Sequence, residues 1–153
     1  MKLLPGSTNP AHPTSTAAAT IDESGAATYV FDLHWNLPAV QLPEGTTHLH
    51  IGSIGTTLTP GDEEVTAAVH RARTTGTISY DPNIRPTVEP SLAIWRDTLA
   101  WMLPRTHLLK ISEEDIGLLF PGQALDTLAS SWLAQGPRLV VITRGGQGAL
   151  GFT

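Results

Sequence analysis

The chain has 153 residues, a formal net charge of −5 and no cysteine, which fits one ordinary domain and excludes both disulfides and cysteine-ligated zinc. The negative charge argues against nucleic-acid binding, which rewards clustered Lys and Arg. No apolar run approaches the roughly 20 residues that span a membrane, and the apolar start is too short for a signal peptide, so we expect a cytoplasmic protein.

The N-terminal part has a different character from the rest of the chain. Residues 1–20 are rich in Pro, Ser, Thr and Ala, which predicts a loop or a poorly ordered start. A turn signal follows, and then Tyr29 and Phe31 stand two residues apart, an alternation typical of a strand. We therefore expect a lid or edge strand over 26–33.

From residue 47 onward, short apolar runs alternate with helical stripes of apolar residues. In chain order, the pattern predicts a strand over 49–51, a helix capped by Asp62, a strand over 77–80, a helix over 92–102, a strand over 107–109, helices over 113–120 and 125–132, and strands over 139–142 and 149–152. This alternation predicts an α/β core of βα units with a parallel sheet over 47–153.

Polar residues follow the carboxyl ends of the predicted strands, where open parallel sheets bind their ligands. The most specific of these segments is Asp81-Pro82-Asn83-Ile84-Arg85. Pro82 fixes the backbone direction, Asn83 can donate and accept hydrogen bonds, and Arg85 offers a planar fork for phosphate or carboxylate. The spacing alone equally allows a turn with Arg85 on the surface.

Three weaker patterns have plain structural interpretations. His48 and His50 share one face of a predicted strand, as metal ligands could, but we expect two ordinary strand residues because no acidic or thiol partner is near in sequence. The run Glu113-Glu114-Asp115 could bind cations, and by itself it is typical of the acidic first turn of a helix. The run 145–148 lacks the dinucleotide spacing and predicts a tight turn in a hairpin.

Four segments in order resemble the ribokinase-like (phosphofructokinase B-type) carbohydrate kinase family, in its fructokinase-like branch. They are the Pro13-Thr14 stretch with the strand that follows it, the Asp-Pro-Asn-x-Arg segment 81–85, the Lys-x-Ser-x-x-Glu-like segment 110–115 and the strand-and-glycine segment 140–149. The resemblance implies a partial ribokinase-like three-layer sandwich with a mostly parallel sheet. It also implies a parent reaction in which the γ-phosphate of ATP passes to a sugar hydroxyl with Mg²⁺.

The resemblance implies roles for single residues, none of them a catalytic base. The sugar or the transferring phosphate would contact Asn83 and Arg85, and Asp115 would serve the metal. The nucleotide side would be formed by Lys110, Ser112, Thr143, Gly145 and Gly148. Two positions depart from many relatives: Ser112 stands in place of Asn, and Asp115 in place of the longer Glu.

Two segments of that family are not found in the sequence. One is the opening glycine-rich sugar segment, and the other is Gly-Ala-Gly-Asp, whose glycines form an anion hole and whose Asp takes the sugar proton. We therefore expect a central fragment, one partial kinase domain over 1–153, inactive alone and dimeric at most in a complete version. Its ligands would be a sugar and ATP, without nucleic-acid or membrane partners. The alternatives are a non-catalytic nucleotide- or sugar-binding remnant and an incomplete gene product.

Overall fold

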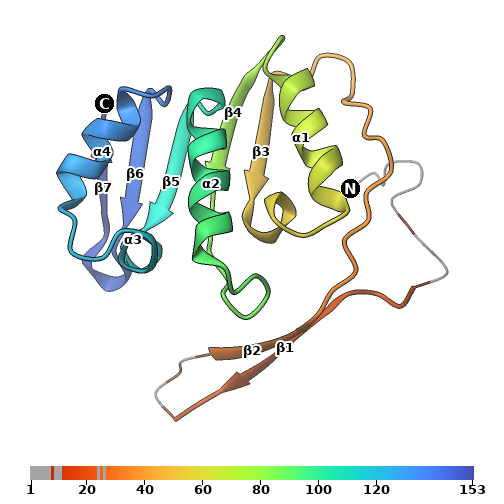
Figure 1. Ribbon diagram of the computed structural model, residues 1–153, viewed down its shortest axis with the longest axis horizontal. Coiled ribbons are helices and arrows are strands. Elements are labelled where there is room, and N and C mark those ends of the chain that lie inside the picture. Colours follow the sequence, from red (N-terminus) through yellow and green to blue (C-terminus); the bar gives the residue numbers. More distant parts are fainter. Residues whose placement is uncertain (1–7, 9–11, 24, 26) are drawn as a thin grey trace.

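The computed structural model describes residues 8, 12–23, 25 and 27–153. These residues form a two-stranded hairpin and a five-stranded α/β body (Figure 1). The strands are β1 (Thr16–Ile21), β2 (Ala27–Asp32), β3 (His48–Gly52), β4 (Thr77–Asp81), β5 (Leu108–Ser112), β6 (Leu139–Thr143) and β7 (Ala149–Phe152). The α-helices are α1 (Gly61–Ala72), α2 (Leu92–Met102), α3 (Glu113–Leu119) and α4 (Leu125–Leu133).

The body has the predicted order of elements and an α/β fold with a mostly parallel sheet. Its strand order is β3-β4-β5-β6-β7, with β3 to β6 parallel and β7 antiparallel to β6. The 3-10 turn Gly145–Gln147 joins β6 to β7, which confirms the predicted hairpin. Positive φ angles of 53° at Gly145 and 84° at Gly148 explain why glycine occupies both positions.

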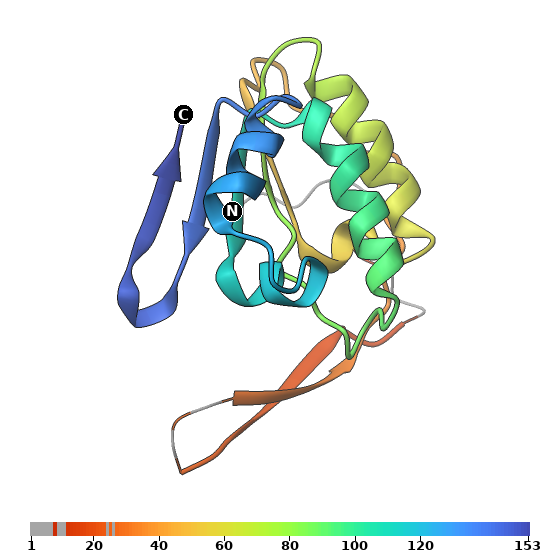
Figure 2. The same ribbon diagram turned by 60° about the vertical axis from the view of Figure 1, so that its left-hand side comes forward.

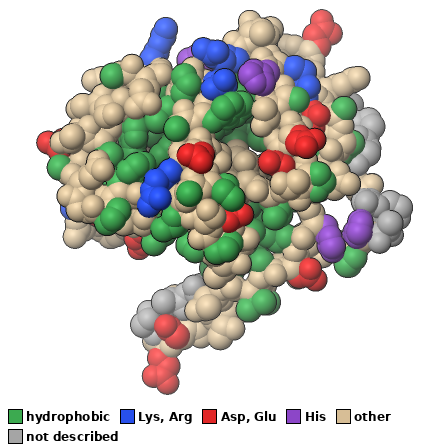
Figure 3. Space-filling view, in the orientation of Figure 1, with side chains coloured by type: hydrophobic (Ala, Val, Ile, Leu, Met, Phe, Trp, Pro, Cys, Tyr) green, Lys and Arg blue, Asp and Glu red, His purple; other side chains and the backbone are tan. Residues whose placement is uncertain are grey.

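The hairpin corrects one expectation. A loop was predicted over 1–20, but Thr16–Ile21 forms β1, paired antiparallel with β2. The sequence Thr-Ala-Ala-Ala-Thr-Ile has no alternation of its own, and the strand exists because β2 supplies the partner. Residues 1–7 and 9–11 of that prediction, and residue 26 of the predicted strand 26–33, lie outside the described residues. The hairpin stands away from the body (Figures 1 and 3).

All four α-helices lie on one side of the sheet (Figures 1 and 2). Strand residues alternate in direction, so every second side chain packs under these helices. The buried set comprises Ile51, Ile78, Tyr80, Leu109, Ile111, Val140 and Ile142. Trp95 of α2 and Trp132 of α4 are also buried and pack in the same core. On the opposite, open face, no helix of the described residues covers the sheet, so this chain shows two of the three layers of a sandwich.

The start of α1 differs from the prediction. The helix begins at Gly61 with Pro60 in the capping position, so Asp62 lies in the first turn and does not cap. A distant residue fixes this start: the Gly61 N–H donates to the Trp35 carbonyl at 3.0 Å. A Cβ at position 61 would lie 2.6 Å from Trp35 Nε1, so only glycine fits. Within the described ranges, none of the helices has the length and apolar character needed to cross a membrane.

Candidate functional site

The carboxyl ends of β3, β4, β5 and β6 lie along one edge of the sheet, as predicted. Parallel pairing places Gly52 opposite Asp81 and Ser112 opposite Thr143. The polar segments that follow these strands are therefore neighbours, although they are far apart in sequence. This edge is the candidate site.

The loop after β4 is held by hydrogen bonds to its backbone. Pro82 is buried, and Asn83 adopts a φ of 41°, a left-handed conformation that Asn tolerates better than most residues. The Asn83 carbonyl accepts a hydrogen bond from Ser53 Oγ at 2.9 Å. Arg85 folds back and donates through Nη1 to the carbonyls of Ile84 at 2.8 Å and Asn83 at 3.3 Å. Arg85 is half-buried, and none of the described carboxylates forms an ion pair with it.

Asp115 joins this loop to the start of α3. Its side chain is only 5% exposed, and Oδ1 accepts a hydrogen bond from the Ile84 N–H at 3.1 Å. Its own N–H donates to Ser112 Oγ at 3.0 Å, so Ser112 caps α3. Asp115 therefore connects the loop after β4 to α3 from a buried position, and its Oδ2 has no hydrogen bond with the described residues around it.

Lys110 is directed toward β4. Its Nζ lies 2.9 Å from Asp81 Oδ2, in an ion pair that remains partly exposed. The other carboxylate oxygen of Asp81 is buried and has no hydrogen-bond partner among the described residues. This orphan acceptor lies at the same edge of the sheet, where a ligand donor could satisfy it.

A polar pocket of about 390 Å³ lies between the ends of β5 and β6. It brings together three of the predicted nucleotide residues with three neighbours, and its lining is Ser112, Glu113, Glu114, Thr143, Arg144 and Gly145. Gly148, in the adjoining turn, and Lys110, which pairs with Asp81, are not among the lining residues. The sequence assigned no role to Arg144, although its place beside Thr143 was a usable signal.

Arg144 spans one wall of this pocket. Its Nε donates to Glu113 Oε2 at 3.3 Å, and its Nη2 donates to Gln147 Oε1 at 2.6 Å. Hydroxyl groups, carboxylates and one guanidinium thus share a single hollow. That combination suits a phosphate group with a hard cation, because the cation prefers oxygen ligands and the guanidinium binds phosphate oxygens.

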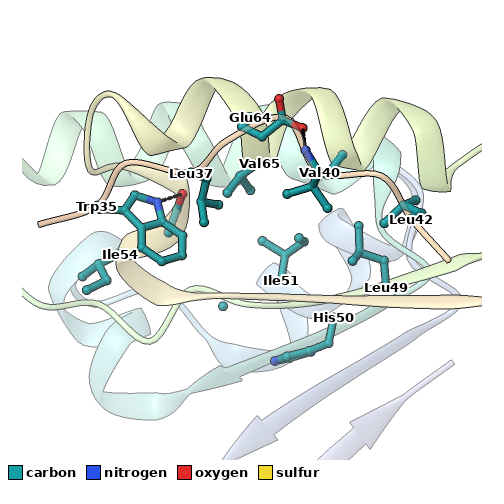
Figure 4. Close-up of a pocket in the computed structure, with 13 residues that line it drawn as sticks. Trp35, Leu37, Val40, Leu42, Leu49, His50, Ile51, Ile54, Glu64 and Val65 are labelled. Carbon is teal, nitrogen blue, oxygen red and sulfur yellow. Dashed lines mark hydrogen bonds between the residues drawn. The ribbon is translucent and has the colours of Figure 1, made fainter. Parts of the chain in front are cut away.

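A second cavity, of about 340 Å³, lies under a crossing segment (residues 35–42) that passes over α1 and β3 (Figure 4). Its lining is mostly apolar, with Trp35, Leu37 and Val65 among the residues drawn. Glu64 at its rim is already engaged: it accepts the Val40 N–H at 2.7 Å and pairs with Arg71, and these contacts lower the pKa of Glu64. The cavity is therefore a poor match for a sugar or a phosphate.

Comparison with known proteins gives a consistent result. The model of the pfkB family carbohydrate kinases matches residues 7–153. The chain is similar to the fructokinase of Rhizobium leguminosarum bv. trifolii (35% identity over 69% of this chain and 32% of that protein) and to the fructokinase of Salmonella typhimurium (30% identity over 91% and 48%). It thus spans about a third to a half of the length of these curated relatives.

Solved structures agree with the sequence relatives. The fold resembles that of Vibrio cholerae fructokinase, with a TM-score of 0.76 and 27% identity over 95% of this chain and 52% of the other. It also resembles a putative Ribokinase II from E. coli in complex with ATP and Mg²⁺, with a TM-score of 0.71 and 28% identity over 90% and 47%. With a family model matching nearly the whole chain, the chain belongs to the pfkB family of carbohydrate kinases.

Proposed function

We propose that this chain forms the nucleotide side and part of the sugar side of an ATP-dependent sugar kinase of the cytoplasm. The observation that carries the proposal is the polar pocket at the ends of β5 and β6, which joins Ser112 and Thr143 in one hollow. Fructose is the first sugar to test, because the relatives above are fructokinases.

The oxygen donors of the pocket fit Mg²⁺. Glu113 and Glu114 supply carboxylates, and Ser112 and Thr143 supply hydroxyls, the hard ligands that Mg²⁺ prefers directly or through water. When bound with ATP, the ion would neutralise charge on the transferring phosphate. Asp115 would contribute through its second oxygen while its first holds the loop after β4.

The loop after β4 would serve the other side of the reaction. Arg85 is preoriented by two backbone carbonyls, so little side-chain freedom is lost when it binds an anion. Its remaining N–H groups would hold a phosphate oxygen, and Asn83 would hydrogen-bond a sugar hydroxyl. Lys110, Gly145 and Gly148 would shape the nucleotide side. We assign no catalytic base within these residues and propose that the chain alone binds ligands without turnover.

Calorimetric titration with ATP and Mg²⁺ tests the nucleotide pocket. We expect saturable binding by the 153-residue chain and at least a tenfold loss of affinity for Thr143→Val, which removes a hydroxyl but keeps the shape. Thr127→Val, at an exposed site on α4, is the matched control and should bind like the parent. Equal affinity in both variants would remove Thr143 from the site, and no binding by the parent would contradict the nucleotide assignment.

The kinase reaction itself is tested in a chimaera in which the Salmonella typhimurium fructokinase supplies the regions outside the match. The chimaera should phosphorylate fructose, whereas this chain alone should not. Arg85→Lys should lower kcat/KM more than tenfold, because a lysine cannot hold two phosphate oxygens in a fixed fork; this corresponds to about 1.4 kcal/mol or more. Arg138→Lys, at an exposed position, is the control. A fully active Arg85→Lys chimaera would make Arg85 a surface residue.

A further inference from the structure

The open face of the sheet carries a cluster that the proposed kinase function does not use. On β3 and β4, two imidazole nitrogens are directed at one hydroxyl: His48 Nε2 lies 2.9 Å and His50 Nδ1 lies 2.8 Å from Ser79 Oγ. Both histidines are exposed, whereas Ser79 beneath them is 7% exposed. Figure 4 shows His50 on the opposite side of β3 from Ile51. The two exposed rings therefore converge on one nearly buried hydroxyl.

The surrounding hydrogen bonds are compatible with a metal-binding tautomer of the first ring. Thr77 Oγ1 lies 2.8 Å from His48 Nδ1 and 3.3 Å from the Thr47 carbonyl. When Thr77 donates to that carbonyl, its oxygen can accept the N–H of Nδ1, and this tautomer presents a lone pair at Nε2, toward Ser79. Metal-binding histidines show this arrangement, in which one nitrogen donates to an oxygen and the other is left as the ligand.

The remaining four histidines of the chain are arranged differently. His12 and His34 are stacked, with ring centroids 4.5 Å apart and an angle of 28° between the planes. His70 packs edge-on against Trp101, and His107 Nδ1 accepts the Ile78 N–H at 3.0 Å. Among the described residues, no group of three or more His, Asp or Glu side chains is placed to hold a metal, so a site at β3 would have two protein nitrogens.

We propose that His48 and His50 form a two-imidazole site for a divalent first-row transition-metal ion, with water completing the coordination. Imidazole nitrogen suits Cu²⁺, Ni²⁺ and Zn²⁺, with Cu²⁺ bound most tightly, whereas Mg²⁺ prefers oxygen ligands. The site is therefore chemically distinct from the polar pocket. Ser79 Oγ itself holds the point on which the two nitrogens converge, so a bound ion has to lie farther out, and both rings have to turn toward solvent to bring their nitrogens within the roughly 2.0–2.1 Å of a metal–nitrogen bond. Exposed side chains on an edge strand allow such a shift.

Titration of the 153-residue chain with Cu²⁺ alone, followed by electron paramagnetic resonance and visible absorption, tests this proposal. We expect one tight ion with two nitrogen ligands. His48→Ala and His50→Ala should each weaken binding at least tenfold and reduce the signal to one nitrogen. His70→Ala, which removes an exposed histidine elsewhere, should leave the binding unchanged.

Ser79→Ala separates a metal site from a purely structural hydrogen-bond network. The substitution removes only the competing hydroxyl, so this variant should bind Cu²⁺ at least as tightly as the parent. Circular dichroism checks the fold, and where an alanine variant does not fold, His48→Gln or His50→Gln replaces it. Unchanged affinity in the His48 and His50 variants, loss of binding in Ser79→Ala, or loss in a His12→Ala/His34→Ala double variant would each overturn the proposal.

Discussion

The two faces of the five-stranded sheet are built from the same strands but have opposite characters. On the helix-covered face, Ile78, Leu109 and Ile142 are completely buried. On the open face, Lys110 and Val141 are only half-buried and His50 is exposed. Parallel sheets are usually covered on both sides. From this contrast we expect the helix-covered face to contribute most of the hydrophobic stabilisation, while the open face is left for polar chemistry or for further polypeptide.

The largest expected difference in stability between the two faces can be measured at two adjacent residues of β6. Ile142→Ala removes a fully buried side chain and should lower the free energy of unfolding by about 2–5 kcal/mol, because it leaves a cavity under the helices. Val141→Ala, one residue away on the open face, should cost about 1 kcal/mol or less. Urea unfolding of both variants measures the difference. Equal losses would mean that the open face is covered in solution.

A pH titration gives the next largest effect. Burial under the helices raises the pKa of Tyr80 to about 12, from an ordinary value of 10.0. The unfolded chain loses this proton near pH 10 and the folded chain near pH 12, so the stabilising effect is complete below pH 10. Between these values it should fall by roughly 2–3 kcal/mol.

Tyr80→Phe provides the control for this titration. The variant should lack the additional loss of stability between pH 10 and 12, as measured by urea unfolding at several pH values. If the parent and the variant show the same slope, the phenol of Tyr80 is accessible to water, and the covered face is less closely packed than described.

The smallest effect is expected on the open face. Ser79→Ala removes the hydroxyl shared by His48 and His50, but both rings are exposed and can turn to water. Unfolding free energy should therefore change by no more than about 1 kcal/mol. Thermal and urea unfolding measure it, and a loss above about 2 kcal/mol would show that this network supports the sheet as strongly as a core contact.

Much of the body was predictable because its signals are local. The alternation of apolar residues in β6, the helical spacing of the apolar stripe of α2 and the glycines of the β6–β7 turn each act within a few residues. The segments 81–85 and 110–115 were likewise found at strand ends, where parallel sheets place their ligand sites.

What the sequence did not predict depends on contacts between distant residues. The start of α1 is set by Trp35, and β1 is a strand because β2 pairs with it. Three further contacts join residues about thirty positions apart. They are the hydrogen bond from the Ile84 N–H to Asp115, the ion pair of Lys110 with Asp81 and the contact of His48 with Ser79. Periodicity within one segment contains no information about such pairs.

The strand order of the body also bears on how it assembles. Each strand from β3 to β7 pairs with the next one in the chain, without a jump. Each parallel pairing joins residues about thirty positions apart, which is a shorter loop than a strand order with jumps would need to close. During synthesis, each newly exposed βα unit can dock on the strand made just before it and does not have to wait for a distant partner. The strand order therefore allows the sheet to form one strand at a time, from β3 to β7, in the order in which the strands are synthesised.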